Sequence, residues 1–389
     1  MRRGGAAGRR PPARAGVVVT GGGTAGHVLP ALAIGRALAG RGRLSGPVRY
    51  VGSRRGMEAR LVEGTGFETV LLPGRGIVRR VGLPALTAAL GLAVAAGRAL
   101  ALVARWRPAA VVTVGGYAGA PCSLAAVALR VPLVVVSLDA VPGAANRLVA
   151  RFAAANAVAL PGTDLPRAVV TGAPVRDAVR ALRPGSAGRR AAREALGVPA
   201  GARLVVVAGG SLGARRLNEA ARELAARWAG RDDVVLYHVA GERDLPSLEA
   251  AGPVGGVLDY RLVGYEARLP EVLLAADVAI CRAGASTVAE LAVLGVPAVL
   301  VPLPGAPGDH QRANAALLHG AGAALLVEDG EATGERLGGI VDELLADDVR
   351  RGAMARAATG LGRPDAADAV AELVESVVDG RPLAVAGAR

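Results

Sequence analysis

The sequence predicts an α/β protein of two Rossmann-like domains that face a central cleft. With 389 residues, the chain is too long for one ordinary hydrophobic core and long enough for two. Hydrophobic residues, mostly Ala, Val and Leu, make up 52% of it, so two cores can be filled. Short β-branched runs alternate with Ala- and Leu-rich stretches along the chain. This alternation is typical of parallel sheets covered by helices.

Each half of the chain contains six short runs that we predict to be strands. They are nearly all apolar, as expected for strands buried on both faces. In the first half they are residues 17–20, 48–51, 69–72, 111–114, 133–136 and 169–171. In the second half they are residues 204–208, 234–239, 260–263, 278–281, 298–301 and 324–327.

Three segments indicate the domain organisation. Residues 1–15 carry five Arg among Gly and Pro, without an acid, and we predict a disordered basic tail there. Residues 183–202 are rich in Pro, Gly and Arg and form the predicted linker. Near the end, apolar residues at helical spacing predict a helix that packs back across the first domain. They are Val370, Leu373, Val374, Val377 and Val378. We therefore expect one domain at 16–176, completed by the helix at 365–379, and a second at 177–364.

The composition narrows the range of partners. The formal net charge is +13, and every basic residue is Arg, which we attribute to composition bias of the genome. The Arg residues are scattered and lack the interleaved aromatics that stack bases, so no nucleic-acid partner is expected. The positive charge favours anionic partners such as phosphates or acidic lipid.

The compartment is indicated by three features. Cys122 and Cys281 lie in different halves, which favours a reducing compartment over a disulfide framework. The basic start is not followed by an apolar region, so we expect no signal peptide. The uncharged run at 81–97 is shorter than the roughly 20 residues that span a bilayer. We expect a cytoplasmic protein that touches a membrane without crossing it.

The first predicted strand runs directly into a glycine loop, Gly21-Gly22-Gly23-Thr24-Ala25-Gly26-His27. Glycines let backbone N–H groups approach an anion, and a following helix adds the positive end of its dipole. The loop lacks both the dinucleotide fingerprint and the Lys of a Walker loop. A tight strand-to-helix turn is the alternative interpretation. We predict a phosphate cradle, with His27 at the sheet edge where α/β proteins bind ligands.

A second glycine turn, Gly115-Gly116-Tyr117, follows the strand at 111–114 and belongs to the same edge. Two such turns suit a ligand with a diphosphate. The second half has two similar turns after predicted strands, Gly209-Gly210-Ser211-Leu212-Gly213 and the segment 282–291. There, residues 285–287 begin a helix whose amides can hold a diphosphate. Glu290, one turn inside, can accept both ribose hydroxyls, unless it is an ordinary solvated side chain.

Metal chemistry is not indicated. The chain has no Asp-x-Asp pair that would hold a divalent cation on a nucleotide. Its four His residues lack the spacing of a zinc site. We therefore expect neither a metal nor another cofactor.

In this order, the segments resemble the MurG family, the bacterial GlcNAc transferases of glycosyltransferase family 28, which have the GT-B fold. The similarity runs from about residue 17 to residue 378. The motifs that carry it are Gly22-Gly23-Thr24-Ala25-Gly26-His27-Val28, Gly56-Met57-Glu58, Gly115-Gly116-Tyr117, Gly172-Ala173-Pro174-Val175-Arg176, Gly210-Ser211-Leu212-Gly213-Ala214-Arg215, Arg282-Ala283-Gly284-Ala285-Ser286-Thr287 with Glu290, and His310-Gln311 with Asn314.

The resemblance implies transfer of GlcNAc from UDP-GlcNAc to undecaprenyl-pyrophosphoryl-MurNAc-pentapeptide, with inversion, in peptidoglycan synthesis. It implies a peripheral protein on the cytoplasmic face of the cell membrane, with the acceptor on the N-terminal domain and UDP-GlcNAc on the C-terminal one. His27 is the implied base. The implied donor contacts are Thr24, Ala25, Gly26, Asp139, Arg176, Ser211, Ala285, Ser286, Thr287, Val288, Ala289, Glu290 and Gln311. The implied contacts to the acceptor pyrophosphate are Gly22, Gly23, Gly115, Gly116 and Tyr117.

The sequence departs from the family at three places. The family usually has His-Glu-Gln-Asn where this chain has Val136-Ser137-Leu138-Asp139. Asp139 thus replaces the Asn that approaches the donor sugar, and an ionised carboxylate accepts hydrogen bonds without donating any. Leu212 replaces a Gln, and Ala173 replaces an Asn. These departures bear on sugar specificity more than on fold or reaction class.

Membrane contact is predicted near the start of the long apolar stretch. Apolar side chains there have a cationic rim, which suits the surface of an anionic bilayer. The predicted patch comprises Ile77, Val78, Arg79, Arg80 and Leu83. An ordinary buried helix start is the alternative.

Other functions remain open from sequence alone. The chain could act on another lipid or natural product as a related GT-B transferase, or be a UDP-GlcNAc epimerase of similar fold. The altered segment 136–139 also leaves a catalytically silent UDP-sugar-binding protein. His27, Glu290 and Gln311 are retained, which favours an enzyme. A nicotinamide dehydrogenase lacks support because its fingerprint is missing.

Overall fold

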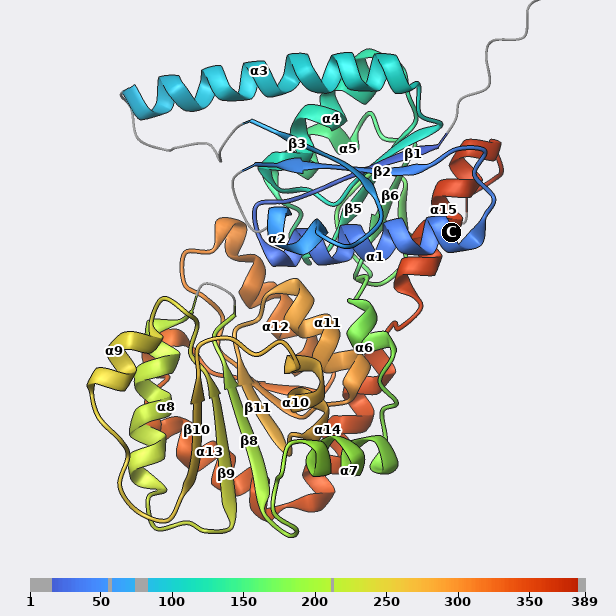
Figure 1. The fold of residues 1–389 in the computed structure, drawn as a ribbon. Helices are drawn as coiled ribbons and strands as arrows, with labels where there is room; N and C mark the ends of the chain where they lie inside the picture. The colour runs from blue at the N-terminus through green and yellow to red at the C-terminus, as the bar shows by residue number, and fades with distance from the viewer. Residues whose placement is uncertain (1–15, 55–57, 74–82, 211–212, 384–389) are drawn as a thin grey trace, which may run out of the picture.

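The computed structural model describes residues 16–54, 58–73, 83–210 and 213–383. These residues form two parallel sheets, each covered by helices on both faces (Figure 1). The predicted tail at 1–15 lies outside the described residues. No helix in the described part of the chain combines the length and apolar character that a membrane crossing requires.

The first sheet has seven parallel strands in the order β3-β2-β1-β4-β5-β6-β7. Its strands are β1 (Val17–Thr20), β2 (Val48–Ser53), β3 (Glu68–Leu72), β4 (Ala110–Thr113), β5 (Leu133–Ser137), β6 (Ala155–Val158) and β7 (Ala168–Val170). Helices α1 (Ala25–Arg41), α2 (Glu58–Val62) and α15 (Ala366–Asp379) lie on one face. Helices α3 (Leu83–Trp106), α4 (Gly116–Ala128) and α5 (Ala144–Ala150) cover the other.

The second sheet has six parallel strands in the order β10-β9-β8-β11-β12-β13. Its strands are β8 (Arg203–Ala208), β9 (Val234–Val239), β10 (Asp259–Val263), β11 (Val278–Cys281), β12 (Ala298–Leu300) and β13 (Ala324–Leu326). On one face lie α8 (Arg215–Arg227) and α13 (Gly334–Ala346). On the other lie α7 (Ser186–Ala195), α10 (Leu269–Ala275), α11 (Ala285–Leu294), α12 (His310–Gly320) and α14 (Asp348–Leu361). The short helices α6 (Asp177–Arg180) and α9 (Leu245–Ala250) complete the set, with 3-10 turns at Pro307–Asp309 and Asp329–Glu331.

Each of the predicted strands is present, with its ends shifted by at most two residues, but β6 was not predicted. Its sequence, Ala-Asn-Ala-Val, has little of the β-branched character that marks a strand. Tertiary burial decides the structure here: all four residues are buried between β5 and β7. The Asn156 side chain donates to the Ala150 carbonyl at 3.1 Å, so its amide is partly satisfied inside the core.

The segment 183–202, predicted as the linker, contains a helix and belongs to the second half. Helix α7 lies within it, packs on α10, and buries Ala192 in the core of the second sheet. Most of the Pro and Gly that suggested a linker stand before or after the helix, where they are tolerated, while its interior is rich in the good helix formers Ala and Arg. The chain passes between the two sheets earlier, between β7 and α6.

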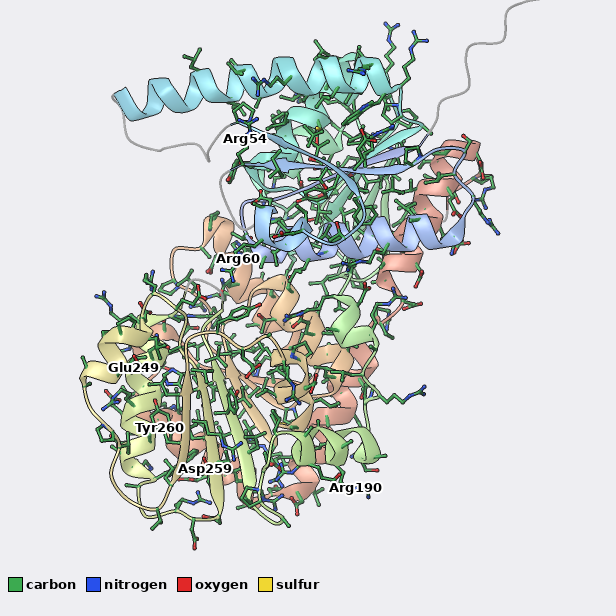
Figure 2. The ribbon with its side chains drawn as sticks, in the orientation of Figure 1. Arg54, Arg60, Arg190, Glu249, Asp259 and Tyr260 are labelled. Atoms are coloured by element: carbon green, nitrogen blue, oxygen red, sulfur yellow. The ribbon has the colours of Figure 1, made fainter. Side chains whose placement is uncertain are left out.

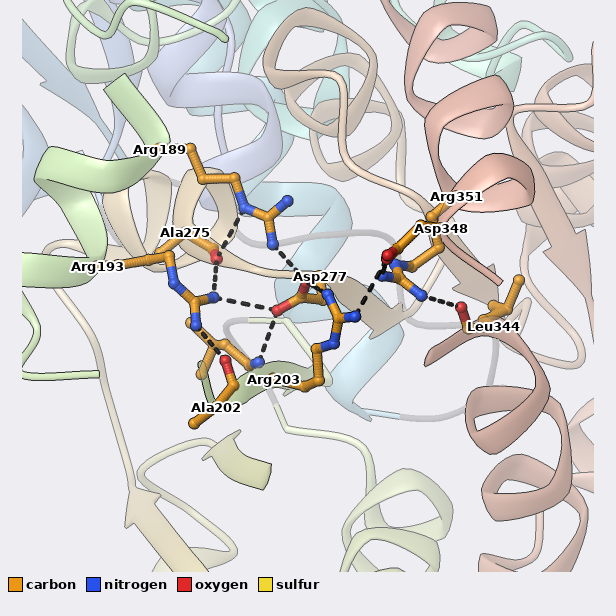
Figure 3. A network of polar contacts seen from close by, with 10 residues as sticks. Arg189, Arg193, Ala202, Arg203, Ala275, Asp277, Leu344, Asp348 and Arg351 are labelled. Carbon is orange, nitrogen blue, oxygen red and sulfur yellow. Dashed lines mark hydrogen bonds and ion pairs between the residues drawn. The ribbon is translucent and has the colours of Figure 1, made fainter. Parts of the chain in front are cut away.

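A buried carboxylate fixes α7 to the second sheet (Figure 3). Asp277 precedes β11 and lies 2.6 Å from Arg189 Nη2 and 3.0 Å from Arg193 Nη1, both on α7. It also accepts the Leu204 N–H at 2.8 Å. Burial alone would raise the pKa of Asp277, but the two guanidinium groups and this amide hold it below its ordinary value. The carboxylate therefore stays ionised and ties the helix to β8.

Helix α15 returns from the second half to pack on α1 (Figure 1), as its apolar stripe predicts. Val370 and Val374 are fully buried in the core of the first sheet. At the far end of α1, Arg41 binds Glu375 through two hydrogen bonds of 3.0 and 3.1 Å. The last helix thus supplies part of the core that the first half lacks.

Candidate active site

The two glycine turns of the first sheet contact each other at the carboxyl ends of β1 and β4. Gly116 has φ 73°, and a Cβ there would lie 2.2 Å from the Gly22 carbonyl oxygen. A Cβ at Gly23 would lie 2.7 Å from the Tyr117 ring. Side chains larger than hydrogen would push these turns apart. The structure thus brings together the five residues for which the family resemblance implies contact with the acceptor pyrophosphate.

His27 lies in the first turn of α1, half-buried, at the same edge. Its Nδ1 is 3.1 Å from the Thr24 hydroxyl oxygen. Burial lowers the pKa of His27 from its ordinary value, against the carboxylates of Asp139 and Glu58, which act to raise it. The neutral imidazole is therefore the form at neutral pH, and a neutral imidazole can accept a proton.

Glu58 was identified in sequence only as part of a motif, without a role. Its side chain is fully buried behind the first glycine loop. One carboxylate oxygen, Oε1, accepts the Gly23 N–H at 2.8 Å and the Ser53 N–H at 3.2 Å. From β2, the Tyr50 hydroxyl donates to the Gly21 carbonyl at 2.5 Å. Residues on two other elements thus hold the loop at both ends.

Helix α11 begins beside the first glycine loop. The first amides of a helix have no partner within it, and its dipole favours an anion there. These amides belong to residues 285–287, as predicted, while the Val288 N–H already bonds the Gly284 carbonyl. The Ser286 hydroxyl donates to the Gly26 carbonyl across the cleft at 3.3 Å. The predicted residue Ser211 lies outside the described residues.

Glu290 and Arg176, both predicted to contact the nucleotide, bind each other. Arg176 Nε and Nη2 each donate to a Glu290 oxygen at 2.7 Å. Burial disfavours the guanidinium, but the hydrogen bonds and charge of Glu290 outweigh it and raise the pKa of Arg176. Each carboxylate oxygen retains a further lone pair for a ribose hydroxyl.

A second contact between the two halves involves Asp139. Asn314 of α12 donates to Asp139 Oδ1 at 2.9 Å and to the Ala283 carbonyl at 3.0 Å. In return, Asn314 Oδ1 accepts the Ala140 N–H at 2.9 Å. Because Asp139 can only accept, it fixes the orientation of the Asn314 amide. The neighbouring Gln311 uses its carbonyl oxygen to accept the Leu303 N–H at 3.0 Å.

The glycine loop after β8 is supported by a buried network that sequence did not predict. Asn218 of α8 donates to the Ala240 carbonyl and to Asp244 Oδ2, both at 3.0 Å. His238 bonds Asn218 Oδ1 at 3.0 Å and the hydroxyl of Tyr260, which lies on the edge strand β10 (Figure 2), at 2.8 Å. Burial lowers the pKa of His238 to about 4, so it is neutral. The network involves side chains far apart in sequence, which explains why no local motif reveals it.

The predicted membrane patch lies largely outside the described residues. Of the predicted membrane patch, Ile77, Val78, Arg79 and Arg80 lie outside the described residues, and Leu83 begins α3. Among the described residues, no group of three or more His, Cys, Asp and Glu side chains is arranged to hold a metal ion.

Two Rossmann-like domains, with glycine loops on both sides of the cleft between them, are typical of the GT-B fold. Residues 17–158 match the glycosyltransferase family 28 N-terminal domain, and residues 204–370 match the family 28 C-terminal domain. The chain belongs to glycosyltransferase family 28 and is a hexosyltransferase.

Its relatives agree over nearly the whole length. The chain is 43% identical over 363 residues to a protein of Alkalilimnicola ehrlichii and 40% identical over 368 residues to one of Acidothermus cellulolyticus. The alignments cover 92% and 94% of this chain, and 97% and 98% of those relatives. Both are named UDP-N-acetylglucosamine–N-acetylmuramyl-(pentapeptide) pyrophosphoryl-undecaprenol N-acetylglucosamine transferase.

Solved structures show the same arrangement. MurG of Acinetobacter baumannii has a TM-score of 0.71 and 28% identity, over 93% of this chain and 99% of that one. A putative UDP-N-acetylglucosamine 2-epimerase of Listeria monocytogenes has a TM-score of 0.70 at 16% identity, over 95% and 99%, which shows the shared fold alone.

Proposed function

We propose that the chain transfers GlcNAc from UDP-GlcNAc to undecaprenyl-pyrophosphoryl-MurNAc-(pentapeptide), with inversion, in peptidoglycan biosynthesis. The observation that carries the proposal is the contact between the two halves at the cleft. There the Ser286 hydroxyl donates to the Gly26 carbonyl oxygen at 3.3 Å. It sets a half-buried imidazole beside a helix N-terminus suited to a diphosphate. Relatives that carry this enzyme's name over nearly the whole chain support the choice of substrates.

The donor is assigned to the second half. The amides at the start of α11, with Ser211, would hold the diphosphate, and Glu290 would accept the ribose hydroxyls. Arg176 would add positive charge near the departing UDP, and Gln311 and Asp139 would meet the sugar. Helix amides and guanidinium groups can stabilise a leaving diphosphate, because they present positive charge where negative charge develops. This arrangement supports a reaction without a metal.

The acceptor is assigned to the first half, and His27 supplies the base. When Nδ1 carries the proton and donates to Thr24, Nε2 is left to accept a proton from the acceptor hydroxyl. The hydroxyl oxygen then bonds the anomeric carbon as the bond to UDP breaks. The proton passes to His27, and the bonding electrons leave with the UDP diphosphate. Attack opposite the leaving group gives inversion.

An anionic membrane surface is the proposed support for the lipid acceptor. Helices α3, α4 and α5 lie side by side on one face of the first sheet. Among the described residues, large apolar side chains are exposed on these helices and just after two of them: Leu90, Val94, Leu100, Leu124, Leu129, Leu148 and Phe152. Arg147 and Arg151 stand beside them, with the Arg151 guanidinium 4.8 Å from the Phe152 ring. Exposed apolar side chains beside cationic groups are typical of membrane contact. We place this face against the cytoplasmic leaflet.

The test is an assay of UDP release with purified protein, UDP-GlcNAc and a lipid-linked MurNAc acceptor, with and without EDTA. We expect UDP release only with acceptor, in step with formation of the disaccharide lipid, and unchanged by EDTA. Conversion of UDP-GlcNAc to an epimer without acceptor would overturn the proposal, as would binding of UDP without any transfer. Flotation with vesicles containing anionic lipid, against neutral vesicles, tests the membrane face.

A further inference from the structure

Glu58 is a buried carboxylate that no step of the proposed reaction uses. It is fully buried at the start of α2, with no guanidinium in hydrogen-bond contact among the described residues. Its Oε1 takes two backbone amides, and within the described part of the chain Oε2 is buried without a hydrogen-bond partner. Burying a carboxylate is costly unless its hydrogen bonds compensate. The placement therefore calls for a role.

The fit between Glu58 and the first glycine loop is close. A Cβ at Gly22 would lie 2.1 Å from Glu58 Oε1 and 3.1 Å from Ala118 Cβ, so a side chain there would displace the Glu58 carboxylate. At Gly52, a Cβ would lie 2.8 Å from the Tyr50 ring and 3.1 Å from Glu58 Cγ. Tyr50 holds the carbonyl of Gly21, while Glu58 holds the amide of Gly23. The loop is thus clamped at both ends by side chains from outside it.

The residue held by Glu58, Gly23, is followed directly by the residue that contacts the His27 imidazole. Gly23 is followed by Thr24, whose carbonyl accepts the His27 and Val28 amides at 3.1 Å each and so starts α1. The Thr24 hydroxyl oxygen is the group beside His27 Nδ1. Any displacement of Gly23 moves both Thr24 and the first turn of α1.

We infer that Glu58 is a positioning residue, which holds the first glycine loop through Gly23 and thereby fixes the orientation of His27 toward the acceptor hydroxyl. The inference rests on the proposed role of His27. It has a second consequence, since the Gly23 amide is occupied by a carboxylate and is not offered to a phosphate. The acceptor pyrophosphate would meet the start of α1 and the turn at Gly115 and Gly116 instead.

The experiment compares Glu58→Ala with Glu58→Gln by kcat and by KM for each substrate. Because one oxygen takes both amides, the Gln carbonyl can replace it. We expect Glu58→Ala to lower kcat about 10- to 100-fold, the cost of a misplaced catalytic group, with KM for UDP-GlcNAc unchanged. Glu58→Gln should restore kcat to within a few-fold of the wild type. A Gln variant as slow as the Ala variant, or an Ala variant as fast as the wild type, would overturn the inference.

A double-mutant cycle decides whether Glu58 acts through His27. In the His27→Ala background, adding Glu58→Ala should lower kcat no further, whereas two independent effects would multiply and refute the inference. If His27→Ala alone leaves kcat unchanged, the proposed base is wrong, which is a separate failure. Should Glu58→Ala not fold, Glu58→Asp, whose shorter side chain withdraws the carboxylate from the Gly23 amide, replaces it in the same two backgrounds, and additivity there refutes the inference equally.

The matched control is Glu375→Gln. Glu375 is equally buried, at 2% exposure, and binds Arg41 at the far end of α1. Its substitution should lower the melting temperature and leave kcat within about two-fold. A loss of kcat equal to that of Glu58→Ala would mean that any buried glutamate packed on α1 has this effect, and would remove the specific role of Glu58.

Discussion

The two halves of the molecule support their glycine loops in different ways. In the first half, Glu58 and Tyr50 bond the backbone of the loop itself, at Gly23 and Gly21. In the second half, Asn218 donates to the Ala240 carbonyl and to Asp244 behind the loop, and its Oδ1 bonds His238. A side chain occupies the amide of Gly23 in the first loop, which makes that loop a rigid mount, whereas the side chains behind the second loop take none of its described amides. We therefore expect the first half to govern turnover and the second half to govern donor affinity.

The largest expected effect is a loss of kcat on substitution of His27 in the first half. His27→Ala should lower kcat by about 10²- to 10⁴-fold, because a general base contributes that much. UDP affinity, measured by calorimetry, should stay unchanged, since the nucleotide is assigned to the other half. If UDP binding weakened as much as turnover, the assignment of the halves would be wrong.

The affinity side is tested by Glu290→Ala. We expect UDP binding to weaken by about 1–3 kcal/mol, as ribose hydroxyls lose their acceptor. The change also leaves Arg176 without the partner at 2.7 Å, so the melting temperature should be followed in parallel. Glu335→Ala, on the exposed face of α13, is the control. An unchanged UDP affinity would remove Glu290 from the donor site.

The pH dependence of kcat/KM reports on the free imidazole. Burial lowers the pKa of His27 from 6.5, and the base must be neutral, so activity should fall only on acidification below that value. Asp139 acts to raise this pKa, so Asp139→Asn should move the acid limb to lower pH. A profile measured over about pH 5 to 8 covers the transition of a histidine. A limb that moves to higher pH in Asp139→Asn would contradict the electrostatic assignment.

The smallest expected effect concerns the sugar. Asp139→Asn restores the residue of the family and removes the fixed acceptor of the Asn314 amide, 2.9 Å away. We expect KM for UDP-GlcNAc or the preference over UDP-GalNAc to change by a few-fold, about the 1 kcal/mol of one hydrogen bond. UDP binding should be unaffected. If neither sugar donor responds, the substitution is neutral.

Features formed by residues close together in the sequence could be predicted, whereas contacts between residues far apart in the sequence could not. The glycine loops, His27 and the stripe of α15 are local patterns, so they were found directly. Strand β6 lacks β-branched residues and is held by burial between its neighbours, which no local pattern reveals. The contact between Glu58 and Gly23 spans 35 residues, and that between Asp139 and Asn314 spans 175. Such pairs are set by the tertiary fold, and they proved to be the ones that organise the site.

The return of α15 to the first half has a consequence for biosynthesis. The core of the first sheet includes Val370 and Val374, which the ribosome delivers about 200 residues after β7. At roughly 5–20 residues per second, the first half waits on the order of 10–40 s with apolar surface of α1 uncovered. During that time the second half is made and can fold on its own. Completion of the first half therefore comes after synthesis of the second half, and a chain that ends before residue 366 would leave it open.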